Sequence, residues 1–125
     1  MWHQPRPRAQ FVVAEAPPTG IDRFGEQPDL WRRAAAEGLG TGALVCTVVG
    51  SGIMGERLAA GNDAIALLVN ALATVFALFV LITILAPVSG AHFNPAVTFA
   101  ARFDDEISNG AAFVHVVAQV SGALG

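Results

Sequence analysis

A run of 23 residues without a charge, residues 64–86, constrains the fold of this chain more than any other feature. It is rich in Leu, Val and Phe and long enough to cross a bilayer, which takes about 20 apolar residues. A second apolar segment, residues 34–55, has Glu37 as its only charge. Gly38 and Gly42 form a GxxxG pair, typical of helices that pack closely in lipid, whereas a glycine-rich helix is unstable in water. We therefore predict a membrane protein.

The composition agrees with this class and argues against others. Charged residues make up 14% of the chain, against about 25% in soluble domains. A net charge of −3 and the absence of lysine argue against a nucleic-acid partner. Because Cys46 is the single cysteine and the three histidines are scattered, we expect no metal and no cofactor. We also expect no enzyme, since the sequence has no nucleophile–base pair and no Gly-rich phosphate loop.

The remaining segments complete an all-α plan. Residues 1–30 contain five prolines and mixed charges without a sustained apolar period, so we predict a disordered tail. The membrane region is predicted over residues 31–125. In it, the polar turn 56–63 joins the first two spans into a hairpin. Residues 109–125 form a third apolar segment of 17 residues, at the lower edge of what spans a bilayer.

The arginines predict the orientation of these spans. Arg32 and Arg33 directly precede the first span, which places the N-terminus in the cytoplasm by the positive-inside rule. The first connection contains only Arg57 and would face outside, and the segment with Arg102 would return to the cytoplasm. We expect a multi-pass protein of a plasma membrane, in this case the bacterial inner membrane.

The segment between the second and third spans, residues 87–102, has a different pattern. Asn94 is a favourable helix N-cap and Pro95 is a favoured first helical residue, so a helix is predicted over residues 95–102. Its length of roughly 12 Å is less than half of a bilayer. Residues 89–93 would be extended, which is tolerated at membrane depth only where protein covers the backbone or a water-filled cavity adjoins it. The spacing alone fits a re-entrant half-helix and an ordinary surface helix equally well.

The ten residues 89–98, Ser-Gly-Ala-His-Phe-Asn-Pro-Ala-Val-Thr, closely resemble the first signature loop of the aquaporin, or major intrinsic protein, family. Glu37 followed by Gly40-Thr41 resembles that family's first helix, and Gln119 resembles part of its third. The resemblance covers about residues 33–125. It implies three transmembrane helices plus one re-entrant half-helix, which is one half of the family's inverted repeat.

The resemblance also implies roles in a passive channel for water or small neutral solutes. Asn94 would donate its side-chain amide to the permeating molecule, while Pro95 and Ala96 would hold the half-helix in place. Backbone carbonyls would form a ladder of acceptors in the cytoplasmic half of the pore. These carbonyls belong to Gly90, Ala91 and His92.

Polar side chains near this loop would be structural. The resemblance implies that Glu37 is buried and accepts hydrogen bonds from the loop, because an acid inside a span is costly without partners. An alternative is that Glu37 reaches interfacial water one turn inside the span. Gln119 would be structural too. His92 is expected to be a packed loop residue rather than a ligand or proton sensor, and His115 to be a packed or interface residue.

One position departs from the water-selective members of the family. Their outer constriction takes a residue from the second span, where many members have an aromatic side chain. This chain has Thr74 there, twenty positions before Asn94, and Leu78 lies one turn further along the same face. The resemblance then implies a wider constriction for larger neutral solutes, such as polyols like glycerol or trivalent metalloid acids like arsenous acid.

The chain matches only one of the family's two halves. The second Asn-Pro-Ala motif and the arginine that follows it are absent from these 125 residues. We therefore expect a truncated product, a fragmentary gene or part of a longer chain, inactive alone. Its partners would be the lipid bilayer and the missing second half. A complete protein with both halves would form a family-like homotetramer. The alternative is a small non-conducting membrane protein that acts through helix–helix packing.

Cysteine labelling tests the orientation. In a Cys46→Ser background, Ala60→Cys should react with a membrane-impermeant thiol reagent added outside intact cells, because position 60 lies in the first connection. Arg8→Cys should stay unlabelled. Labelling at position 8, or protection at position 60, would reverse the predicted topology.

Overall fold

The computed structural model describes residues 28–125 and, over this range, contains helices but no strand. Its elements are α1 (Leu30–Leu58), α2 (Asp63–Ser89), α3 (Pro95–Phe103) and α4 (Asn109–Leu124). Most of the predicted tail lies outside the described residues. Leu30, the last residue of the predicted tail, already belongs to α1.

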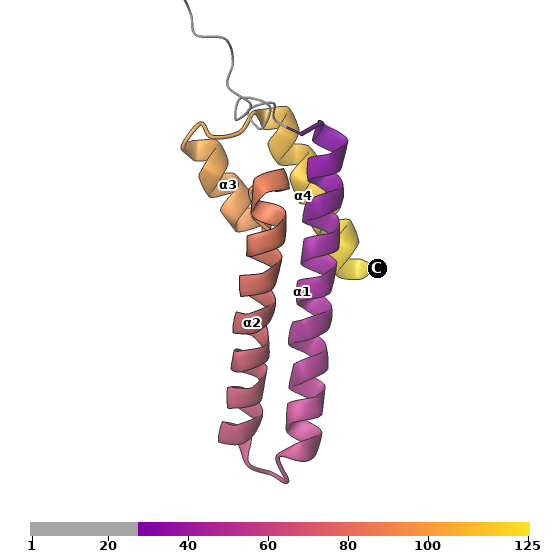
Figure 1. Cartoon of the computed structure of the whole chain (residues 1–125), viewed down its shortest axis with the longest axis vertical. Helices are drawn as coiled ribbons and strands as arrows, with labels where there is room; N and C mark the ends of the chain where they lie inside the picture. Colours follow the sequence, from indigo (N-terminus) through magenta and orange to yellow (C-terminus); the bar gives the residue numbers. More distant parts are fainter. Residues whose placement is uncertain (1–27) are drawn as a thin grey trace, which may run out of the picture.

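Helices α1 and α2 form a long antiparallel hairpin (Figure 1). Both are long and apolar enough to cross a membrane, and among residues 28–125 they are the only helices that are. Helix α1 extends beyond the predicted span 34–55 at both ends, because the hydrogen-bonded helix continues into charged turns outside the apolar segment. Ser89 is the only buried residue of α2, so this helix turns apolar side chains outward along its whole length. That exposure suits a lipid environment.

The end of α2 differs from the prediction. Pro87 was expected to end the second span after residue 86, yet the helix runs through Pro87 to Ser89. A proline removes one backbone donor, which membrane helices tolerate where neighbouring groups compensate. Here the helix closes one turn later, where the Gly90 N–H donates to the Ala86 carbonyl at 3.0 Å. Gly90 has a left-handed backbone with φ of 92°, a common way to end a helix.

Helix α4 packs along α1, and both helices begin at the same end of the hairpin (Figure 1). Small residues line the contact. A Cβ atom added at Gly42 would lie 2.8 Å from the Gly122 carbonyl oxygen, and one at Gly38 would lie 3.1 Å from the Ala118 carbonyl oxygen. The GxxxG face of α1 is therefore occupied by α4 of the same chain.

Helix α3 packs against α4 at the same end of the hairpin (Figure 1). The contact is a cluster of small and aliphatic side chains, namely Ala101, Ile107, Ala111 and Ala112. In the loop between the two helices, Asp105 forms an exposed ion pair of 2.6 Å with Arg102 of α3. Helices α2, α3 and α4 thus all bring residues to the first turns of α1.

The close approach of α1 and α4 predicts a penalty for Gly122→Ala. The new methyl group would overlap the Gly38 carbonyl, so overpacking should cost about 1–3 kcal/mol of unfolding free energy. Gly110→Ala is the matched control, because it lies in the same helix with open space around its Cβ position. Thermal unfolding in detergent, followed by circular dichroism, should show a lower Tm for Gly122→Ala than for the control. Equal melting temperatures would contradict the contact.

Candidate functional site

The site begins where Asn94 starts helix α3. Asn94 has an extended backbone, and its Oδ1 accepts the Ala96 N–H at 2.8 Å. Pro95 follows as the first helical residue, and the helix ends at Phe103, one residue beyond the predicted end. The Asn94 side chain is exposed, and its amide nitrogen donates to no group of residues 28–125. Capping the helix thus occupies the oxygen of Asn94 and leaves its N–H groups available to an external acceptor.

The loop before Asn94 turns sharply. Gly90, Ala91 and Phe93 all have positive φ angles, of 92°, 54° and 48°. Left-handed backbone costs a non-glycine residue about 1–2 kcal/mol, so Ala91 and Phe93 must be held there by their surroundings. Phe93 is 4% exposed, and its ring lies against Gly40 of α1, where any added side chain would overlap it. Glycine at position 40 therefore makes room for the ring that anchors the loop.

The Glu37 carboxylate holds the rest of the loop. It is fully buried, and its Oε1 accepts the Ser89 hydroxyl at 2.6 Å and the His92 N–H at 3.0 Å. Its Oε2 accepts the Phe93 N–H at 2.7 Å and the Gln119 amide at 2.8 Å. Four hydrogen bonds match the acceptor capacity of a carboxylate. Glu37 therefore joins α1 to the end of α2, to the loop and to α4.

A second set of hydrogen bonds ties α3 to the same cluster. Gln119 Nε2 also donates to Thr98 Oγ1 at 2.9 Å, and Thr98 Oγ1 is hydrogen-bonded to His92 Nδ1 at 3.1 Å. The Ser89 hydroxyl in turn accepts the Ala91 N–H at 3.1 Å. Sequence reasoning assigned no role to Ser89, Phe93 or Thr98, although all three lie within the ten-residue signature.

The carbonyls of Gly90, Ala91 and His92 accept no hydrogen bond from residues 28–125 outside the helical ladders. Gly90 and His92 line a cleft of about 260 Å³, whose polar wall includes Arg33, Ser89 and Glu106. Free carbonyls beside a polar cleft can coordinate a passing hydrogen-bond donor. The loop therefore has three acceptors in succession, and the Asn94 amide follows them in the chain.

Thr74 and Leu78 lie outside this cluster, one turn apart on α2 and half-buried. The Thr74 hydroxyl donates to the Asn70 carbonyl of its own helix at 2.8 Å. The Asn70 amide in turn donates to the Val48 carbonyl at 2.7 Å and so ties α2 to α1 at this level. The described residues do not bring Thr74 or Leu78 into the group around Glu37.

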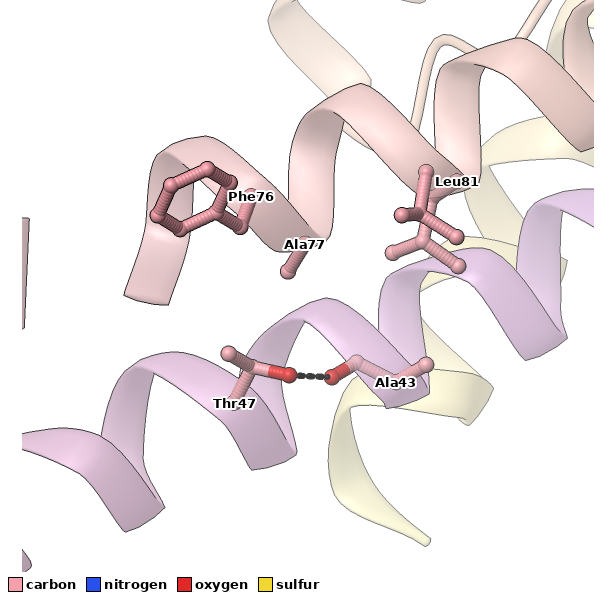
Figure 2. A pocket seen from close by; sticks show the side chains of 6 residues that line it. Ala43, Thr47, Phe76, Ala77 and Leu81 are labelled. Atoms are coloured by element: carbon pink, nitrogen blue, oxygen red, sulfur yellow. Dashed lines mark hydrogen bonds between the residues drawn. The ribbon is translucent and has the colours of Figure 1, made fainter. Parts of the chain in front are cut away.

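A larger hollow lies between α1 and α2, but its chemistry is different. Figure 2 shows its lining, which includes Ala43 and Thr47 of α1 and Phe76, Ala77 and Leu81 of α2. The volume is about 370 Å³. The Thr47 hydroxyl is its main polar group, and this hydroxyl donates to the Ala43 carbonyl at 2.9 Å. The hollow is therefore an apolar packing surface rather than a site for a polar solute.

Comparison with known proteins supports a single family. Residues 25–125 match the family model described as major intrinsic protein. The chain is 52% identical over 96 residues to the aquaglyceroporin AqpS of Rhizobium meliloti (strain 1021). This match covers 77% of this chain and 41% of the relative. It is 35% identical over 109 residues to a probable TIP-type aquaporin of Medicago truncatula, with 84% of this chain and 43% of the relative covered.

A third relative is aquaporin TIP1-2 of Zea mays, 39% identical over 99 residues, with 78% of this chain and 39% of the relative covered. The chain therefore spans about two fifths of the length of these curated relatives. No solved structure matches it.

The geometry around Glu37 predicts a strong effect of Glu37→Gln. Glutamine would present one oxygen and one NH₂ group, so two of the four donors would face another donor. Each unsatisfied buried donor costs about 1–3 kcal/mol, so the unfolding free energy should fall by about 2–6 kcal/mol. The readout is thermal unfolding in detergent. Glu56→Gln is the matched control, since Glu56 is exposed near the other end of α1. Similar melting temperatures for the two variants would refute the role assigned to Glu37.

Proposed function

Because the chain belongs to the major intrinsic protein family, we propose that it forms one half of a passive transmembrane channel for water or small neutral solutes. The chain is an integral membrane protein, and α1 and α2 are long enough to cross the bilayer. Transport of this kind involves no covalent step. We therefore assign binding roles and no catalytic residue.

The observation that carries the proposal is the polar path from Gly90 to Asn94. Within residues 28–125, three carbonyls without a donor precede an exposed amide nitrogen without an acceptor. A permeating water molecule or hydroxyl group would donate to the carbonyls of Gly90, Ala91 and His92 and accept from Asn94. The N-terminus of α3 adds the positive end of a helix dipole, which disfavours cations at this position. Pro95 and Ala96 keep that end of α3 beside Asn94.

We propose that the permeating solutes include neutral molecules larger than water. Thr74 occupies the position implied for the outer constriction, and its side chain is smaller than the aromatic residue of many family members. The relative at 52% identity carries the name aquaglyceroporin, which supports testing glycerol first. Uncharged metalloid acids have similar hydroxyl donors and are the second class of solute to test.

We propose that the N-terminus is cytoplasmic, in a bacterial inner membrane. Helix α1 begins, and α3 ends, at the same end of the hairpin (Figure 1), so Arg32, Arg33 and Arg102 gather there. Arg57 lies near the opposite end of α1. This distribution supports the positive-inside assignment.

The partner proposed is a second half of opposite orientation, with a homotetramer as the assembled form. The alternative, a non-conducting protein that acts through its small-residue face, has less support. Gly38 and Gly42 are the residues suited to such packing, and they already contact α4.

A chimera tests the pore. Residues 1–125 followed by the remaining part of the Rhizobium relative should accelerate water and glycerol flux in proteoliposomes, measured by stopped-flow light scattering. Asn94→Asp keeps the capping oxygen but removes the donor and adds a negative charge, so flux should fall to the level of empty vesicles. Asn62→Asp is the matched control, since Asn62 caps α2 at an exposed turn.

Residues 1–125 alone should leave the flux unchanged, because the carbonyls of Gly90 to His92 need a covering partner. Flux through this polypeptide that Asn94→Asp abolishes would overturn the half-channel proposal. A chimera that folds but does not conduct would overturn the assignment of the pore itself.

The selectivity of the same chimera tests Thr74. Thr74→Phe should lower glycerol flux more strongly than water flux, because an aromatic ring narrows the constriction. Thr83→Phe is the matched control, since Thr83 is exposed on α2 and also bonds within its own helix. An equal effect of the two substitutions on glycerol flux would remove Thr74 from the constriction.

A further inference from the structure

A second polar layer lies one helical turn from the Glu37 cluster. Arg33 precedes Glu37 by four residues on α1, and His115 precedes Gln119 by four residues on α4. Residues four apart share a helix face. Since Glu37 and Gln119 are hydrogen-bonded at 2.8 Å and both helices begin at the same end (Figure 1), Arg33 and His115 lie on adjacent turns of the two helices.

The polar atoms of this layer have unused hydrogen-bonding capacity. His115 is fully buried, and neither of its ring nitrogens has a partner among residues 28–125. The same holds, within those residues, for Gln119 Oε1 and Arg33 Nε, both buried atoms. Buried polar groups nearly always have a protein or water partner. The carbons of the His92 ring cannot supply one, although this ring lies edge-on to His115 with centroids 5.6 Å apart.

The donor or acceptor character of these atoms indicates which kind of hydrogen-bond partner they require. Arg33 Nε–H donates and Gln119 Oε1 accepts, while a neutral imidazole has one nitrogen of each kind. An anion would use only the donors, and a metal ion only the acceptors. Water is both donor and acceptor, and a buried water typically has two to four polar partners.

We propose that one ring nitrogen of His115, together with Gln119 Oε1 and Arg33 Nε, forms the binding site of an ordered water molecule between α1 and α4. Arg33 also lines the cleft of about 260 Å³ beside Ser89 and His92, so water can reach the layer from that cleft. The bound water ties the two helices together one turn above Glu37 and fixes the His115 ring against His92. Water thus reaches this site from the cleft that Gly90 and His92 also line, but its binding does not depend on conduction.

Solid-state NMR of residues 1–125 in lipid bilayers tests the proposal. Carbonyl-¹³C valine combined with ¹³C,¹⁵N-histidine identifies His115 without a mutation, because only His115 follows a valine, whereas His3 follows Trp2 and His92 follows Ala91. Polarisation transferred from water protons should build up faster at one of the His115 ring nitrogens than at its helical backbone nitrogen. A rate at the ring no faster than at the backbone would overturn the water site.

A pair of variants tests the contribution of Arg33 in the same spectra. Arg33→Met removes the Nε–H and should shift the His115 ring ¹⁵N resonances and slow their polarisation by water. Arg32→Met is the matched control, because Arg32 is exposed beside it and should leave both unchanged. Unmoved His115 resonances in Arg33→Met, or a direct dipolar contact between Arg33 Nε and the His115 ring, would overturn the bridging geometry.

Discussion

One buried carboxylate organises the part of this protein that lies around the first turns of α1. Glu37 accepts hydrogen bonds from Ser89 at the end of α2, from the backbone of His92 and Phe93, and from Gln119 of α4. These bonds form around a fully buried carboxylate, so each bond is worth more than it would be at a surface. The carboxylate is itself tolerable inside a span only because all four bonds form together. The left-handed backbone at Ala91 and Phe93 persists because the Glu37 carboxylate holds the N–H groups of His92 and Phe93.

Close packing makes that arrangement possible. The Glu37–Gln119 bond requires the backbones of α1 and α4 to approach within the reach of two side chains. Glycines at positions 38, 42 and 122 allow this approach, since a side chain at any of them would press on the facing backbone. Gly40 fulfils a related need by making room for the Phe93 ring. Glycines that would weaken a soluble helix are therefore the residues that let the polar cluster form.

Local chemistry explains what the sequence could predict and what it could not. The Asn94-Pro95 pair defines the start of α3 because an N-cap and a proline at the first turn act within a few residues. Family resemblance, rather than spacing, pointed to Glu37 and Gln119. Ser89 and Thr98 were missed because their partners lie 52 and 21 residues away in the chain. The rule that proline ends a helix failed at Pro87, where a left-handed glycine three residues later closes the helix instead.

The order of synthesis gives the Glu37 cluster a further consequence. The donors to this carboxylate lie 52, 55, 56 and 82 residues after it in the chain. Glu37 emerges from the ribosome before any of these donors. The nascent α1 helix therefore reaches the membrane with a carboxylate that has no hydrogen-bond donor. Its ties to Ser89 and the loop can form once α2 has been made, but the contact with Gln119 must wait until α4 emerges. The group that holds the finished fold together is thus among the first residues to enter the bilayer and among the last to be satisfied.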